Sequence, residues 1–495
     1  MATKYDLHYL AAQIDDACEK RDQANLVHLV GVCETILNEG NGTDRVDLHY
    51  FVSNSYSSLW EIRSELEGPW AWNAHEIISG ILALRKAIAE PDFVHSPLIR
   101  RCQIRTNLAN KLSMLGRSVE AIEEYSAVVA LDPNFAMALG NRALATVTYS
   151  RNLYDPGHRC LLLNCAASDY DKALSPDAYW DSDFGPDVAD HFQIDDTRIR
   201  KFLDSVGFDS NVDLGSFTMG ETLQEIEYRQ WCLSHCLFLN SINDVMREPI
   251  AAYDVLHLPS HSYKFGDQVR FPAFFNILKQ EYVSARYNLF KSGIWDEAHV
   301  SDRDVLLIDS FDYGSFNYRT EQLKSAFLSA YAIFDKIALF LNEYFEVGLA
   351  EKQVSFRGIW ERQVKGGSVE LRDAFEGSKN LPLRGLYFLS KDFFDENFVE
   401  FASPDARGLA SLRNFAEHRY LTLVEMGAPQ VSDESHLRLS REDFSNRTLR
   451  LLKMTRAGLI YLSAAMHRQE EMKEDSKADS DGAFVIQFPV VPIVR

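Results

Sequence analysis

Arg413, Asn414 and His418 are the residues whose types and spacing best suit catalysis, and they stand in the segment LRNFAEHRYL as Arg-Asn-x-x-x-His. A histidine can move a proton near neutral pH, and an arginine can stabilise negative charge that builds on a phosphate. Cleavage of RNA by its own 2'-hydroxyl needs these two functions and no metal ion. The pattern therefore indicates an acid or base site directed at a phosphate.

Helix geometry constrains how these side chains can meet. At about 100° per residue, Arg413 and His418 lie about 140° apart, whereas Asn414 and His418 lie about 40° apart. One helix face thus presents Asn414 with His418, and Arg413 must reach round or act across a two-fold interface. Glu417 and Arg419 flank the histidine and are secondary candidates that could tune its protonation. The alternative is structural, because an arginine and a histidine on a partly apolar helix often form only a surface ion pair and a satisfied core histidine.

The motif and its surroundings resemble the HEPN superfamily, whose R-x4-6-H signature often has a polar residue directly after the arginine. The segments YRQWCLSHCLFLN and LPLRGLYFLSKDFF are similar to a prokaryotic branch in which HEPN bundles follow TPR-like helices, and the resemblance covers roughly residues 220 to 470. It implies a metal-independent endoribonuclease with His418 as general base or acid, Arg413 holding the scissile phosphate and Asn414 orienting either group. It also implies a homodimer in which two motifs line one cleft.

The resemblance gives the expected partners and setting. We expect RNA as substrate, no cofactor and no metal, with a role in prokaryotic stress response or antiviral defence, as for a toxin nuclease. One alternative is a non-catalytic scaffold in which both halves bind proteins and the bundle is a dimerisation module. Another is a HEPN partner or substrate of a nucleotidyltransferase, which would need a separate enzyme.

Charge limits how RNA could bind. The 495 residues include 51 basic and 72 acidic side chains, a net charge of -21, so the chain repels polyanions on average and RNA binding must rest on a local basic site. A row of cations at three-residue steps on the last predicted helix, with one more just before it, predicts such a stripe. The stripe consists of Arg441, Arg447, Arg450, Lys453 and Arg456. Solvated cations that balance nearby acids are the alternative. Arg286, Arg372 and Arg384 could also line a cleft.

The C-terminal half must position the motif. Apolar residues at three- and four-residue steps predict a long helix over EQLKSAFLSAYAIFDKIALFLNEYF. FNILKQEYVSARYNLF precedes it and ARGLASLRNFAEHRYLTLVE follows it, while Ser440 and Asp443 begin a last helix that runs toward residue 472. Four antiparallel helices around one core make a bundle. An insertion with polar loops lies between the second and third helices.

The first third of the chain is repetitive. In TNLANKLSMLGRSVEAIEEYSAVVALDPN, seven residues fall where a tetratricopeptide (TPR) repeat places its interdigitating side chains: Leu108, Ala109, Leu112, Gly116, Ala121, Tyr125 and Pro133. Stacked helix pairs leave a concave groove that can hold a protein or a peptide. The alternative is that these helices form only a stabilising shell.

We therefore predict an all-α protein, with a TPR-like helical solenoid followed by a HEPN-type antiparallel bundle. The predicted organisation is 1–175 repeats, 176–270 connector with helices, 271–472 bundle, and 473–495 acidic linker and apolar tail. The tail is expected to dock in extended form on this subunit or its twin.

Cysteine usage and hydropathy bear on metals and location. Seven thinly spread cysteines indicate reduced thiols, and we expect no membrane span because no run approaches about 20 apolar residues, so we place the protein in the cytoplasm. Cys232, His235 and Cys236 could supply metal ligands, but no second pair stands at zinc-finger spacing, and we assign no metal.

Overall fold

The computed structural model describes residues 6–39, 44–180, 186–210, 213–264, 270–294, 298–308, 313–364, 369–394, 404–425, 431–432, 436–476 and 483–486. Helices dominate and the strands are few and short, which confirms the predicted all-α class. The chain divides into two compact units. Among the described residues, the first unit lies within Met1–Arg151 and Arg159–Ser210, and the second within Asn152–His158, Asn211–Phe394 and Pro404–Arg495.

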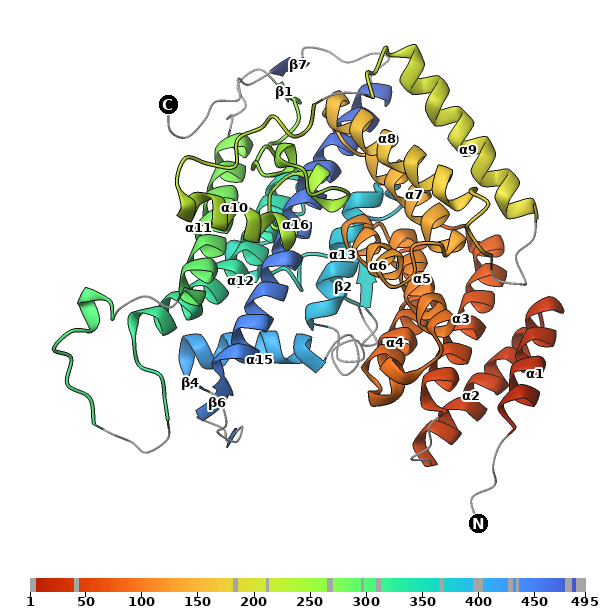
Figure 1. Ribbon diagram of the computed structural model, residues 1–495, viewed down its shortest axis with the longest axis horizontal. Coiled ribbons are helices and arrows are strands. Elements are labelled where there is room, and N and C mark those ends of the chain that lie inside the picture. The colour runs from red at the N-terminus through yellow and green to blue at the C-terminus, as the bar shows by residue number, and fades with distance from the viewer. Residues whose placement is uncertain are drawn as a thin grey trace. The chain divides into compact units, whose positions relative to one another are not determined.

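The first unit is a succession of helices in which each packs mainly on its neighbours in the chain, as the ribbon in Figure 1 shows from α1 to α7. They are α1 (Leu7–Glu19), α2 (Gln23–Glu39), α3 (Arg45–Glu67), α4 (His75–Ala89), η1 (Pro91–His95), α5 (Leu98–Met114), α6 (Ser118–Leu131), α7 (Ala136–Ser150), α8 (Pro156–Ala173) and α9 (Pro186–Ser205). Local packing of this kind is the pattern expected of a helical solenoid.

Helices α5 and α6 coincide with the predicted repeat unit. Leu108, Leu112 and Tyr125 are buried, as are the small residues Ala109 and Ala121. Gly116 lies in the turn between the helices with a φ of 84°, a left-handed conformation that glycine adopts without the steric penalty of a Cβ atom. The helix pair was thus predictable, whereas its assignment to the TPR family stays a prediction.

Helix α9 belongs to the first unit, although the predicted organisation put residues 176–270 into the connector. Its Phe192, Ile199 and Leu203 are buried in one apolar cluster with residues of α7 and α8. Gly140 of α7 lies directly under Phe192, so that a Cβ atom at this position would overlap the phenylalanine ring. The contact requires glycine at residue 140.

A buried histidine links α3 to the end of α4. The Nε2 atom of His49 lies 3.3 Å from Oε1 of Glu90, which also accepts a 2.9 Å hydrogen bond from Nε of Arg45. Burial is the main influence on the imidazole and lowers the pKa of His49 to about 4, with Glu90 acting in the opposite direction. His49 is therefore neutral in the folded protein at neutral pH.

The second unit is built around five helices. They are α11 (Phe271–Gly293), α12 (Tyr318–Tyr344), α13 (Leu381–Phe394), α15 (Pro404–His418) and α16 (Arg441–Ser476). α12 and α16 pack against each other and against α11, and α13 packs on α16 (Figure 1). α13 lies within the predicted insertion, yet its Leu383, Leu386 and Leu389 are buried. The insertion therefore contributes a core helix besides its loops.

Short elements complete this unit: α10 (Leu223–Ser234), η2 (Ser241–Asp244), η3 (Pro249–Ala251), β1 (His261–Lys264), η4 (Val300–Asp302), η5 (Glu351–Gln353), β2 (Glu361–Gln363), β3 (Val369–Leu371), β4 (Tyr420–Val424), β5 (Val431–Ser432), β6 (His436–Ser440) and β7 (Ala483–Ile486). Among the described helices, α12 is long and apolar enough to span a membrane, but more than half of its apolar stretch is buried inside the unit. A buried apolar stretch of this kind is expected of the core helix of a bundle.

Two buried arginines hold the irregular segment between α10 and α11. Arg456 of α16 forms a 2.6 Å ion pair with Asp244 and donates to the carbonyl oxygens of Phe238 and Asn240 at 2.5 and 2.7 Å. Arg286 of α11 pairs with Asp254 at 2.7 Å. Burial opposes the charged guanidinium of Arg286, but the neighbouring Asp254 outweighs it and holds the pKa well above its usual value. The segment is thus part of the core of this unit.

The predicted third bundle helix is wrong after His418. The helix ends at His418, and Tyr420–Val424 form β4, which pairs in parallel with β6 from Tyr420↔His436 to Val424↔Ser440. β6 also pairs antiparallel with β5, so the strand order is β4-β6-β5. Burial alternates over Tyr420–Leu423, with Leu421 and Leu423 inside, which is a strand pattern and not a helical one, and Val424 is buried as well.

The end of the chain returns to the start of the bundle. β7 pairs antiparallel with β1, from His261↔Ile486 to Lys264↔Ala483. Part of the predicted apolar tail therefore docks in extended form on its own subunit, whereas residues 487–495 lie outside the described residues.

Candidate functional site

Helix α15 presents the motif on its outer side. Leu409, Leu412 and Phe415 are buried, and they anchor the helix to α12, α13 and α16. Asn414 and His418 project from the opposite side and are exposed, with 63% of the His418 side chain accessible. The helical repeat of 3.6 residues puts these two side chains on one face, as predicted from the spacing. His418 is also the last residue of the helix.

Glu417 lies between the two key residues of the motif. Its Oε2 atom forms a 2.6 Å ion pair with Nε of Arg413 and lies 3.6 Å from Nε2 of His418. The spacing of four residues brings Glu417 beside Arg413 on the helix surface. Arg413 and His418 are predicted to lie about 140° apart around the helix, and the Glu417 carboxylate lies between their side chains. Glu417 is therefore the secondary candidate that contacts both residues.

Arg413 also contacts an aromatic ring beneath it. Its Cζ atom lies 5.7 Å from the ring centroid of Tyr331 in α12. Burial raises the pKa of Tyr331 to about 12, with the nearby Asp335 adding to the increase and Arg413 opposing it. From the sequence alone, Tyr331 belongs to the apolar face of its helix. Asp335 stands four residues later on the same face, and this spacing is the only indication in the helix sequence that Tyr331 has a polar neighbour.

The small sheet places further polar residues directly after the motif. Tyr420, which is 74% exposed, is paired with His436 across the β4–β6 ladder, and the Nε2 atom of His436 lies 2.9 Å from Oγ1 of Thr422. Arg438 lies opposite Thr422. Sequence reasoning missed His436 and Arg438 because it predicted helix where β4 forms, and only the strand pairing brings them beside the end of α15.

The predicted basic stripe does not form one exposed row. Arg456 is 1% exposed and its guanidinium is engaged by Asp244 and two backbone carbonyls, so this position is corrected from a surface contact to a core cation. Arg441 donates to Oγ1 of Thr320 at 3.0 Å and to the carbonyl oxygen of Ser292 at 2.7 Å. Burial lowers the pKa of Arg441, and the nearby Arg319 acts in the same direction.

The rest of the stripe is half-buried. Arg447 forms a 3.1 Å ion pair with Asp443 on the same helix, and Arg450 and Lys453 lie further along it. A steady three-residue step drifts around a helix of 3.6 residues per turn, so the row passes from half-buried positions at Arg447, Arg450 and Lys453 into the core at Arg456. Arg441 lies at the opposite end of β4 from His418, a distance of about 16 Å for five residues of strand.

The other cations considered from the sequence are also held by the protein. Arg286 is buried in its pair with Asp254, and burial lowers the pKa of Arg384 to about 10. Arg372 donates to the carbonyl oxygen of Gly358 at 3.2 Å.

Cys232 is buried, which raises the pKa of its thiol to about 12, and Sγ of Cys236 lies 2.7 Å from Nη2 of Arg247. Within the described ranges, no group of three or more His, Cys, Asp or Glu side chains could hold a metal ion.

Comparison with known proteins places the motif inside a recognised domain. Residues 263–469 match the model of the LA2681-like HEPN family. No curated protein and no solved structure matches the chain. The match spans less than half of the chain, includes α11 to most of α16, and supports the resemblance to the HEPN superfamily for this domain. The first unit lies outside the matched range.

Proposed function

We propose that the second unit is a metal-independent endoribonuclease of HEPN type that cleaves RNA by attack of the 2'-hydroxyl. The single observation that carries this proposal is the position of Arg413 and His418 at the exposed end of α15, joined through Glu417 and lying inside the family-matched range. His418 acts as general base or acid, Arg413 holds the scissile phosphate and Asn414 orients either group. Arg419 adds positive charge beside the histidine.

The geometry of the guanidinium supports this division of roles. A guanidinium carries five N–H donors in a planar fork, so the pair between Nε and Glu417 uses only a minority of them. The ring of Tyr331 lies beneath the guanidinium, with its centroid 5.7 Å from Cζ of Arg413. The whole chain has a net charge of -21 and repels polyanions on average, so RNA binding must rest on the cations at this end of α15, Arg413 and Arg419. A second copy would complete the cleft as a homodimer.

The test is cleavage of cellular RNA by the purified full-length chain in EDTA. We expect His418→Ala to reduce cleavage at least about 100-fold, as loss of a general acid or base does, while the exposed His28→Ala of the first unit leaves it unchanged. Equal cleavage by the wild type and His418→Ala would reject the site. Loss of wild-type cleavage in EDTA would reject the metal-free mechanism.

A non-catalytic scaffold is the second candidate, and one observation favours it. The contacts of Glu417 with Arg413 and His418 are the internal ion pairing that a purely structural role for the motif requires. In this case the second unit serves as an interaction module. Absence of RNA cleavage in every fraction of correctly folded protein, with or without divalent ions, would favour the scaffold over the nuclease.

The first unit completes the proposal. Its stacked helices offer a surface for a protein or peptide ligand that triggers or recruits the second unit. The setting is the cytoplasm, in a stress or defence response. Affinity capture with the full-length chain, compared with a variant whose exposed α3 and α5 side chains carry reversed charges, would test for such a ligand. A ligand that binds both proteins equally would contradict this assignment.

A further inference from the structure

Exposed aromatic side chains gather beside β4. Among the described residues, four side chains of Phe, Tyr and Trp are more than half exposed: Tyr9 at 65%, Tyr313 at 82%, Phe316 at 55% and Tyr420 at 74%. Tyr9 belongs to the first unit, whereas the other three lie in β4 or in the segment Tyr313–Phe316 that pairs with it. Burial of a large ring is favourable, so a concentration of exposed rings at one place indicates a surface that a ligand covers.

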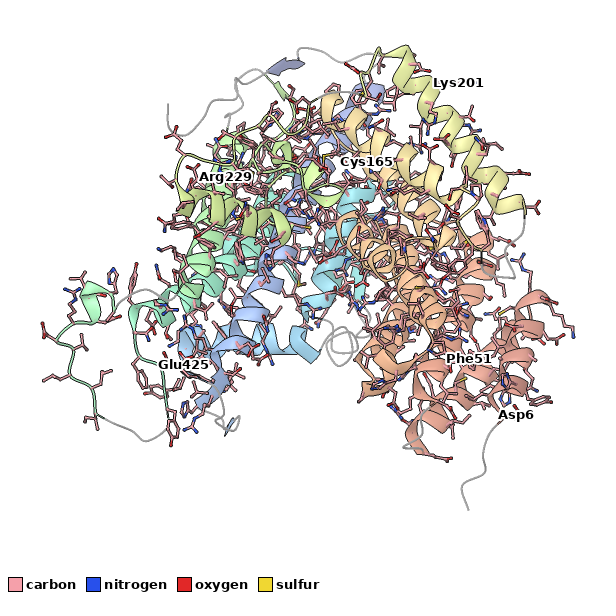
Figure 2. The ribbon with its side chains drawn as sticks, viewed as in Figure 1. Asp6, Phe51, Cys165, Lys201, Arg229 and Glu425 are labelled. Carbon is pink, nitrogen blue, oxygen red and sulfur yellow. The ribbon has the colours of Figure 1, made fainter. Side chains whose placement is uncertain are left out.

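The segment Tyr313–Phe316 precedes α12 and lies against the end of β4. Gly314 forms an antiparallel bridge with Val424, and Glu425, which is labelled in Figure 2, directly follows the strand. Tyr313 has a φ of 59°, a left-handed conformation that is uncommon for a bulky side chain and that concentrates at functional sites. The segment is therefore held beside the strand at a cost in backbone strain.

The ring of Phe316 lies on the same face of the sheet as Tyr420. A Cβ atom added to Gly314 would lie 2.6 Å from Cε2 of Phe316 and 2.9 Å from Cγ2 of Thr422, so the ring and the methyl group lie beside the same point. Successive side chains of a strand project to opposite faces, which puts Thr422 with Tyr420 and leaves Leu421 on the buried face. Two exposed aromatic rings therefore share the outer face of this sheet.

β6 adds basic side chains to the same face. His436 and Arg438 are the ladder partners of Tyr420 and Thr422, and paired residues project to the same side of a sheet. The Nε2 atom of His436 lies 2.9 Å from Oγ1 of Thr422, a hydrogen bond that orients the imidazole. Aromatic rings next to cations are the combination with which proteins hold single strands of nucleic acid.

This face begins at the candidate catalytic histidine. α15 ends at His418, and Tyr420 is the first residue of β4. Two residues of strand span roughly 7 Å, so the ring of Tyr420 is within reach of the nucleotide next to a phosphate held at His418. Arg419 stands between the two residues and adds a positive charge.

We propose that the outer face of β4 and β6 binds RNA beside the scissile phosphate, with an unpaired base stacked on the ring of Tyr420. We name this face the aromatic platform (Phe316, Tyr420, His436 and Arg438). The inference rests on the proposed ribonuclease and deepens it by naming the residues that hold its substrate. Phe316 stacks a further base, and Arg438 contacts a phosphate of the same strand. Stacking of this kind requires bases outside a duplex.

The test measures RNA binding by the full-length chain in the His418→Ala background, so that cleavage does not consume the ligand. Fluorescence anisotropy with a short unstructured RNA oligonucleotide gives the Kd. We expect Tyr420→Ala to raise the Kd about fivefold to 100-fold, as loss of one stacked base does, whereas Tyr420→Phe keeps the ring and binds like the parent. Tyr9→Ala is the matched control, an exposed tyrosine of the first unit that should leave the Kd unchanged. Circular dichroism establishes that each variant is folded.

An oligonucleotide that lacks one base separates stacking from other contacts. When the base next to the scissile phosphate is removed from the RNA, Tyr420→Ala should have little further effect on the Kd, because the ring has lost its partner. The same RNA annealed to its complement should bind at least about fivefold more weakly. Arg438→Gln should lower the salt dependence of binding by about one phosphate contact.

The outcomes separate this inference from the nuclease proposal. RNA binding that depends on the ring of Tyr420, in a wild-type chain that cleaves no RNA, would support the aromatic platform and reject the nuclease. Cleavage by the wild type with an unchanged Kd in Tyr420→Ala would overturn the platform and leave the nuclease intact. An equal loss in Tyr420→Phe, or an equal effect of Tyr420→Ala on the RNA that lacks the base, would also overturn the platform.

Discussion

The Oε2 atom of Glu417 lies 2.6 Å from Nε of Arg413, so a carboxylate occupies one edge of the guanidinium proposed to bind phosphate. In the proposed nuclease, Glu417→Gln removes a negative charge that competes with RNA for Arg413. We therefore expect the KM for RNA to fall about threefold to tenfold, with kcat changing less, in initial-rate measurements at fixed ionic strength. A higher KM would show that Glu417 positions Arg413 productively.

Arg456 is expected to support the fold and not to bind RNA. Arg456→Met leaves Asp244 and the carbonyls of Phe238 and Asn240 buried without their donor, and breaking a buried ion pair costs about 3 to 5 kcal/mol. The readout is the denaturant midpoint of the second unit. Lys453→Met, one turn earlier and half-buried, should change the unfolding free energy by less than about 1 kcal/mol. Similar losses in both variants would contradict this assignment.

Two glycine substitutions in the first unit should change the free energy of unfolding in opposite directions. Gly140→Ala drives a methyl group into the ring of Phe192 and should destabilise the docking of α9 by about 3 kcal/mol. Gly31→Ala, inside α2 with nothing within 4 Å of the added Cβ, should stabilise by about 1 kcal/mol. Thermal unfolding measures both effects on stability. A neutral Gly140→Ala would mean that α9 does not pack on α7.

His49 should make the first unit sensitive to mild acid. Its folded pKa of about 4 lies below the ordinary 6.5, so the unfolded chain takes up the proton first as the pH falls. The contribution of the neutral histidine to the free energy of unfolding is fully present above pH 6.5. It is lost progressively as the pH falls toward 4, by up to about 3 kcal/mol. Urea unfolding of His49→Gln should show a smaller loss over this window, while His28→Gln, which is exposed, should behave as the wild type.

Much of the second unit followed from periodicity, because α11, α12 and α16 bury continuous apolar faces that repeat at helical spacing. The exposed pair Asn414 and His418 followed from the same geometry. The switch to β4 did not, since the residues after His418 are apolar enough for either structure and only pairing with the distant β6 selects the strand.

Whether a given cation is buried, and which group it pairs with, depends on tertiary contacts. Arg447 and Arg456 look alike in the sequence, yet the half-buried Arg447 pairs with Asp443 on its own helix and Arg456 pairs with Asp244 in the core. The partner of Arg456 lies more than 200 residues away, at a separation of 212 positions, and no local pattern indicates it. The bridging role of Glu417 was partly predictable, because it stands four residues after Arg413.

β1 and β7 form a strand pair although they stand at opposite ends of the second unit's sequence. His261 and Ile486 face each other, so the two ends of a segment of more than two hundred residues meet at one point. The strand pair therefore closes this long segment on itself at one point. Asp244 and Asp254 lie before that point, so a transplanted or circularly permuted bundle would have to carry them along to keep the buried pairs of Arg456 and Arg286.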